Sequence, residues 1–194
     1  ENVVSTFNNI TSAEVGLAFD MTVVPEAELV YVSALPTMLT EVGFIIDGQP
    51  VSYDKASELM RKEILSLDAS FDVNYATERV ELAVRASGSV LEESEKGLKW
   101  IETVLYNPDW RPENLPRIRD AIDIALTNAR NGMKGWEEFW VQVPINTYWR
   151  QSNPLLLSSK SFLTKQHSLL KLKWMLREAE DEESAVQFAQ FMKD

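Results

Sequence analysis

The sequence lacks the residues on which much enzyme chemistry depends. It has no cysteine, and His167 is its only histidine in 194 residues. Without cysteine, thiolate nucleophiles, disulfides, cysteine-based zinc sites and iron–sulfur clusters are excluded. A hydrolytic zinc centre usually holds its metal with two or three imidazoles, so one histidine is too few. The residues therefore indicate a segment that is not a self-contained catalyst.

Other scarcities narrow the class of protein. No apolar run approaches the roughly 20 residues of a membrane helix, so no membrane insertion is expected. A net charge of −11 argues against nucleic acid and anionic membranes as partners. The length and the 45% hydrophobic content fit one domain, or one domain with a helical extension. The chain begins at Glu1 without a signal peptide and looks like part of a longer protein. Its location stays open, and the missing cysteines favour the cytoplasm.

Three segments alternate apolar and polar residues, which is the pattern of strands that bury one face. They cover residues 14–23, 69–75 and 79–86. Only a few residues around Ala76 and Thr77 separate the second segment from the third. A hairpin between these two strands is therefore expected.

Helical patterns occupy most of the remaining chain. A helix is predicted to begin at Pro25, to be kinked by Pro36 and to end at Gly43. After a loop at 47–50, Ser52 is predicted to cap the next helix. Apolar stripes and breaks predict further helices over 91–105, 115–129, 135–143, 160–177 and from about 182.

This order, β-α-α-β-β-α-α, predicts an α+β fold with an antiparallel-type sheet and helices packed on one face. We expect an α+β domain over residues 1–131. Residues 132–194 are expected to form a helical extension or an inter-domain connection.

One stretch reverses the acidic character of the chain. Residues 151–177 contain no acidic residue but five cations: Lys160, Lys165, Lys171, Lys173 and Arg177. One interpretation is a solvated helix face whose cations lie near its C-terminal end, where the helix dipole favours them. The other is a site for an anion or a peptide.

Aromatic residues gather between Gly135 and Arg150. Trp136, Trp140 and Val143 recur at i, i+4 and i+7, which is core spacing on a helix and predicts packing. A peptide-binding wall is the alternative, since aromatic rings give broad contact area. The candidate interface or peptide contacts are Trp136, Trp140, Tyr148, Trp149 and Arg150. We expect His167 to be a surface or interface residue.

Two stretches of the chain resemble one known family. The first stretch consists of Thr6-Phe7-Asn8-Asn9-Ile10 and the predicted strand at 15–21. It resembles the T-N-G-I-x-Y…F-D-L strand of insulinase-type (pitrilysin) zinc metallopeptidases. Residues 25–43 resemble that family's L-P-x-E-x-L-x-Y-L-P-L…L-L-T-E-L-G helix, including Pro36 and Gly43. The similarity is to the presequence-protease-like branch. It covers residues 6–45 and extends to about residue 130.

The resemblance implies a non-catalytic domain, because the family's H-x-x-E-H signature and its distant glutamate have no counterpart in this chain. It therefore implies no catalytic residue and no metal or cofactor in this segment, with zinc in the catalytic domain of the parent protein. The family also holds substrate through an arginine and a tyrosine of its non-catalytic half. Tyr148 and Arg150 are of these types without the local pattern, so that role is not assigned to them.

The function implied is that of a domain which helps to form a peptide-enclosing chamber and packs against the catalytic half. Its partners would be the other domains of the same polypeptide and an unfolded peptide substrate. One alternative is a catalytically inactive scaffold or assembly subunit of the same fold, distinguished by whether H-x-x-E-H precedes Glu1 in the parent reading frame. Another is an unrelated peptide-binding module that uses the surface from Trp136 to Trp149.

Overall fold

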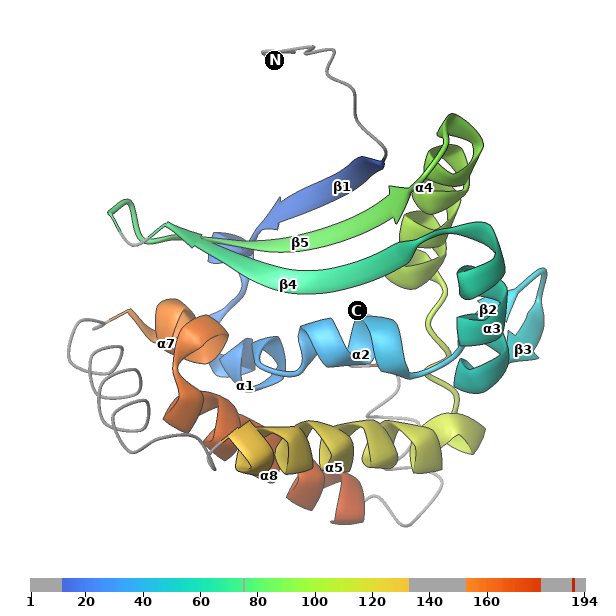
Figure 1. Cartoon of the computed structure of the whole chain (residues 1–194). Coiled ribbons are helices and arrows are strands. Elements are labelled where there is room, and N and C mark those ends of the chain that lie inside the picture. Colours follow the sequence, from blue (N-terminus) through green and yellow to red (C-terminus); the bar gives the residue numbers. More distant parts are fainter. Residues whose placement is uncertain (1–11, 75, 133–152, 179–189, 191–194) are drawn as a thin grey trace.

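A three-stranded antiparallel sheet forms one side of the protein (Figure 1). The structure is a computed structural model that describes residues 12–74, 76–132, 153–178 and 190. The strands are β1 (Ala13–Asp20), β4 (Ser66–Asn74) and β5 (Arg79–Gly88), in the order β1-β5-β4. The predicted hairpin is confirmed as β4–β5. The Asn74 side chain accepts hydrogen bonds from the backbone N–H groups of Ala76 and Thr77 in its turn.

The period-two pattern of the strands separates an apolar from a polar sheet face. On the apolar face, Val15 lies opposite Ala86 and Phe71 lies opposite Leu82. This face contributes to the core, and the helices packed against the sheet contact it. The prediction of an α+β fold with helices on one sheet face is confirmed.

The first strand is shorter than the alternation predicted. It ends at Asp20, and residues Met21–Val23 form the 3₁₀ turn η1. The Asp20 carboxylate accepts a hydrogen bond from the Thr22 N–H at 2.9 Å. Because an aspartate can cap such a turn through its own side chain, this contact ends the strand before the apolar alternation does.

The helix expected over residues 25–43 is divided rather than kinked. A 3₁₀ turn, η2 (Glu26–Glu28), leads into α1 (Leu29–Val32), and α2 (Leu35–Glu41) begins after a short break. Pro36 occupies the first turn of α2. Since proline has no N–H, it cannot bond the carbonyl of Val32 four residues earlier, and the helix stops there. Gly43 follows the end of α2 with φ 87°, as its predicted role in helix termination requires.

A small hairpin occupies the segment that was predicted to be a loop. It joins β2 (Phe44–Ile46) to β3 (Gln49–Val51). Asp47 and Gly48 both have positive φ, as the two central residues of a type I′ turn do. The Asp-Gly pair is a strong hairpin signal. The loop predicted at 47–50 is confirmed at Asp47-Gly48, whereas Gln49 and Pro50 belong to β3.

The later helices follow the apolar stripes, with one addition. Ser52 caps α3 (Tyr53–Glu63), and α4 (Leu91–Tyr106) ends one residue beyond the predicted range of 91–105. A 3₁₀ turn, η3 (Pro112–Asn114), precedes α5 (Leu115–Gly132). Beyond these lie α7 (Pro154–Lys160), which was not predicted, and α8 (Phe162–Glu178). The helices predicted at 135–143 and from 182 lie outside the described residues.

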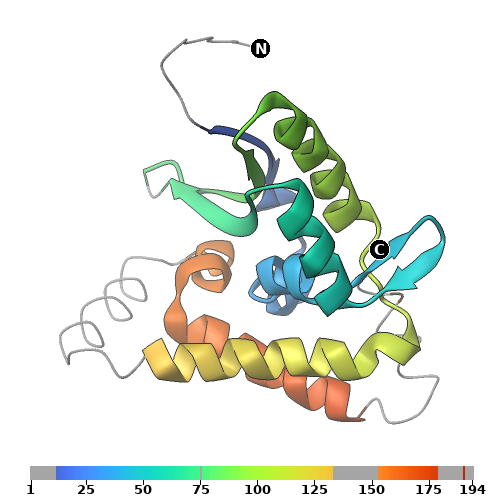
Figure 2. The same cartoon turned by 45° about the vertical axis from the view of Figure 1, so that its right-hand side comes forward.

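The elements form layers around two buried clusters (Figures 1 and 2). The upper core lies under the sheet and includes Val84, Ile101 and Leu156. The lower core joins α1 and α2 to α5 and α8 through Met38, Ile122 and others. Although they lie beyond residue 131, α7 and α8 contact α1, and α8 also contacts α5. The domain boundary at residue 131 stays a prediction. No described helix is long and apolar enough to cross a membrane.

Candidate functional site

The sequence-predicted contact residues cannot be placed in this fold. Trp136, Trp140, Tyr148, Trp149 and Arg150 all lie outside the described residues. His167 is described and lies on α8 with its side chain exposed, as expected for a surface or interface residue. Within the described ranges, no group of three histidine, cysteine, aspartate or glutamate side chains could hold a metal ion.

The polar face of the sheet is organised by Arg85 at its centre. This side chain reaches Glu14 on β1 at 3.8 Å and forms an ion pair with Asp72 on β4. It also donates a hydrogen bond to the Ser70 hydroxyl at 3.3 Å. Helix contacts to the sheet fall on the opposite, apolar face, so in the described part of the chain this charged surface remains open.

A polar hollow of about 360 Å³ lies between α2, α3 and the beginning of β4. Glu41, at the end of α2, is held there by Arg117 from α5. The Arg117 Nε donates to the Glu41 carbonyl at 2.6 Å, and its Nη2 contacts the carboxylate at 3.0 Å. The same guanidinium lies 4.0 Å from the centre of the Tyr53 ring. One arginine therefore joins three helices at this hollow.

The surroundings of Tyr53 favour its neutral phenol. Burial raises the pKa of Tyr53 above its ordinary value, and the negative charge of Glu41 adds to the rise. Arg117 and Arg61 oppose it. At neutral pH the phenol therefore stays protonated and can donate or accept a hydrogen bond. No spacing in the sequence signals this cluster, because Glu41 and Arg117 are 76 positions apart.

A second hollow, of about 160 Å³, continues from the first. Both are lined by Thr40 and Glu41. The first is lined by residues 66–68 and the second by Ala69, so both border β4. In Figure 1, α2 and α5 lie below β4. We call the two hollows together the β4 groove.

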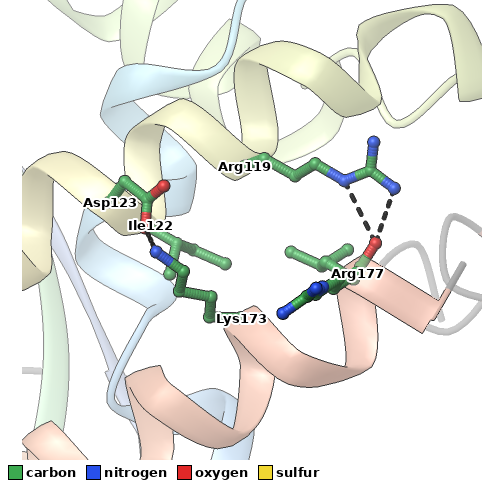
Figure 3. Close-up of a pocket in the computed structure, with 6 residues that line it drawn as sticks. Arg119, Ile122, Asp123, Lys173 and Arg177 are labelled. Carbon is green, nitrogen blue, oxygen red and sulfur yellow. Dashed lines mark hydrogen bonds and ion pairs between the residues drawn. The ribbon is translucent and has the colours of Figure 1, made fainter.

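A third hollow lies between α5 and α8 (Figure 3). Its polar side chains already have partners. Lys173 pairs with Asp123 at 2.5 Å, and Arg119 donates two hydrogen bonds to the Leu176 carbonyl. Arg177 lies over the ring of Trp174. The Lys173 and Arg119 contacts attach the end of α8 to α5, which is a structural role.

The outward side of α8 carries exposed apolar side chains beside the exposed cations Lys165, Lys171, Lys173 and Arg177. Leu163, Leu170 and Trp174 are 55%, 40% and 58% exposed and recur at i, i+7 and i+11. His167 falls on the same side by spacing. A separate set, Leu169, Leu172 and Leu176, is buried in the lower core. We call the exposed set the α8 stripe. Its spacing is visible in the sequence, but only the packing shows which apolar side of the helix remains open.

Comparison with known proteins adds no relative to this description. No model of a known protein family matches the chain, and no curated protein matches it. The fold and its surfaces define the class: an α+β domain whose described part has one open polar sheet face and an outer helix with exposed apolar side chains.

Proposed function

We propose that this chain is a non-catalytic domain of an insulinase-type zinc metallopeptidase. In this role it forms part of the wall of a peptide-enclosing chamber and packs against the catalytic half. The zinc and its ligands would lie in the catalytic domain of the parent protein. The partners would be the other domains of that polypeptide and an unfolded peptide.

The observation that carries this proposal is the two-sided character of the domain. One side presents the open, charged sheet face that Arg85 organises. The α8 stripe lies on a helix in the layer farthest from that sheet (Figure 1). A wall that separates a water-filled chamber from a neighbouring domain requires a polar and an apolar surface in this way. The resemblance of residues 6–45 to the family's strand and helix supplies the particular family.

The first test needs only the parent reading frame. An H-x-x-E-H motif upstream of Glu1 supports the peptidase, whereas its absence favours the inactive scaffold of the same fold. The 194-residue chain alone should neither bind stoichiometric zinc nor cleave peptides. If it did either, the assignment to a non-catalytic domain would be wrong.

The second test concerns the α8 stripe. Trp174→Ser should lower the free energy of unfolding of the parent protein by about 2 kcal/mol, because the ring would lose its apolar contact there. The same change in the isolated chain should cost less than about 0.5 kcal/mol, since the side chain is largely exposed. The matched control is Tyr106→Ser on α4, where the ring is 78% exposed. Equal costs of Trp174→Ser in both proteins would contradict packing through α8.

A further inference from the structure

We propose that the β4 groove binds an extended polypeptide segment, which adds to the sheet as a strand beside β4. The segment would carry apolar residues on the side facing the helices and lysine or arginine on the outward side. This inference does not rest on the proposed function, because an inactive scaffold with this fold would have the same groove.

The main chain of β4 supplies the first argument. In the strand order β1-β5-β4, β4 is an edge strand of the described sheet. Every second residue of an antiparallel edge strand directs its N–H and C=O away from the sheet. Residues 66–69 of this edge strand line the groove. At about 3.3 Å per residue, this length of edge accommodates four to five residues of an added strand.

The lining of the groove determines the inward side chains of the segment. Met60 on α3 and Ile64, the residue after its end, contribute apolar surface among the polar groups near one end. On α5, Ile124 and Ala125 do so near the other, and the Ile124 side chain is 44% exposed. An added strand alternates its side chains between the two faces of the sheet. Valine or a similar residue at every second position of the segment would therefore cover the apolar side chains that line the groove.

The outward side of β4 determines the charge of the segment. Asp68 and Asp72 lie on the polar sheet face, and Arg85 pairs with Asp72. Asp68 is exposed and has no ion pair among the described residues. A cation opposite Asp68 would form a favourable cross-strand pair. A second copy of this chain is disfavoured, since antiparallel β4–β4 pairing centred on Ser70 would place Asp68 against Asp72.

The test uses the whole 194-residue chain and a fluorescently labelled pentapeptide of alternating lysine and valine. Fluorescence anisotropy should show saturable binding. Asp68→Lys should weaken binding roughly five- to tenfold and should strengthen binding of the matching glutamate–valine peptide. The matched control is Glu102→Lys, an exposed position on α4 away from the groove. Ser57→Trp, which places a large ring in the groove, should abolish binding of both peptides.

Backbone methylation tests strand addition itself. Only alternate N–H groups of an added strand point toward β4. One peptide is N-methylated at both valines and another at the central lysine. One of the two should lose about tenfold or more in affinity and the other should not, because each backbone hydrogen bond contributes on the order of 1 kcal/mol. Three results would each overturn the proposal. They are a lack of saturable binding, an equal loss of affinity in both methylated peptides, and an equal weakening of peptide binding by Asp68→Lys and Glu102→Lys. None of these results depends on zinc or on a parent peptidase.

Discussion

Gly43 shows how one residue decides the path of the chain between two elements. It follows α2 with φ 87°, a conformation that costs a side-chain-bearing residue about 1–2 kcal/mol. A Cβ at this position would also lie 2.8 Å from the Val51 carbonyl. Glycine is therefore required twice, for the backbone conformation and for the close approach of β3.

Replacing this glycine should destabilise the protein more than replacing one in an open turn. We expect Gly43→Ala to lower the free energy of unfolding by about 2–3 kcal/mol. Gly48→Ala, with φ 73° but no atom within 4 Å of a built Cβ, should lower it by only about 1 kcal/mol. Urea denaturation of both variants measures the difference. Equal losses of unfolding free energy in the two variants would show that the close approach of the added methyl group to the Val51 carbonyl costs no stability.

The raised pKa of Tyr53 predicts a loss of stability at alkaline pH. Burial and then Glu41 raise its pKa, so the folded protein holds the phenolic proton more tightly than the unfolded chain does. The stability this provides is fully present below the ordinary tyrosine pKa of about 10, and it is lost as pH rises through the folded pKa.

Comparison with Tyr53→Phe isolates this effect from the titration of lysines and other tyrosines. The difference in unfolding free energy between the wild type and the variant should be constant below about pH 10 and should shrink above it. Urea denaturation across this range measures it, with tyrosinate absorbance reporting the phenol directly. A difference that grows with pH would contradict the raised pKa.

At the scale of elements, α7 is the one described α-helix that no predicted helix included. Its start has recognisable signals, since Pro154 lies in the first turn and the Asn153 side chain accepts a hydrogen bond from the Leu155 N–H. Its seven residues are too few to form a periodic stripe. Ser161 separates it from α8, and the Ser161 hydroxyl accepts from the Thr164 N–H.

We expect α7 to be an integral part of the upper core. Leu156 is fully buried there, so Leu156→Ala should lower the free energy of unfolding by about 2–5 kcal/mol. The control is Leu163→Ala, a largely exposed position at the start of α8, which should change it by less than about 0.5 kcal/mol. Thermal or urea denaturation distinguishes the two. A small effect of Leu156→Ala would place α7 outside the cooperative fold.

At the scale of the whole molecule, α1 and α2 lie between the two cores. Val32 and Leu39 belong to the upper core, whereas Met38 and Val42 belong to the lower one. These short helices therefore bury residues on opposite sides. The sheet and the outer helices should unfold together, because neither core keeps its packing without this shared layer.

Met38→Ala tests this coupling. It should lower the global stability by about 2–5 kcal/mol. Native-state hydrogen exchange should show the same loss for amides of β5, in the upper core, and of α5, in the lower one. Val23→Ala, at an 82% exposed position, is the control and should leave both unchanged. Loss of protection in α5 alone would show that the cores unfold separately.

Much of the local structure could be predicted from the sequence. Alternation located the three long strands, because side chains of a strand point to opposite faces in turn. The apolar stripes located α3, α4, α5 and most of α8 for the corresponding helical reason. The exact ends were less predictable, since Asp20 acts through one hydrogen bond and Pro36 through one hydrogen bond that it cannot form. Periodicity registers neither.

The sequence by itself determined the α+β class, the β4–β5 hairpin and the stripes that each element buries, because these depend on residues near one another in the chain. Only the tertiary structure decided that β5 lies between β1 and β4, and that β4 therefore has an outer edge. It also brought Arg117 to Glu41 and placed Ile124 and Ala69 in the lining of one hollow. Such contacts join distant segments through the packing of whole elements, and no local pattern encodes them.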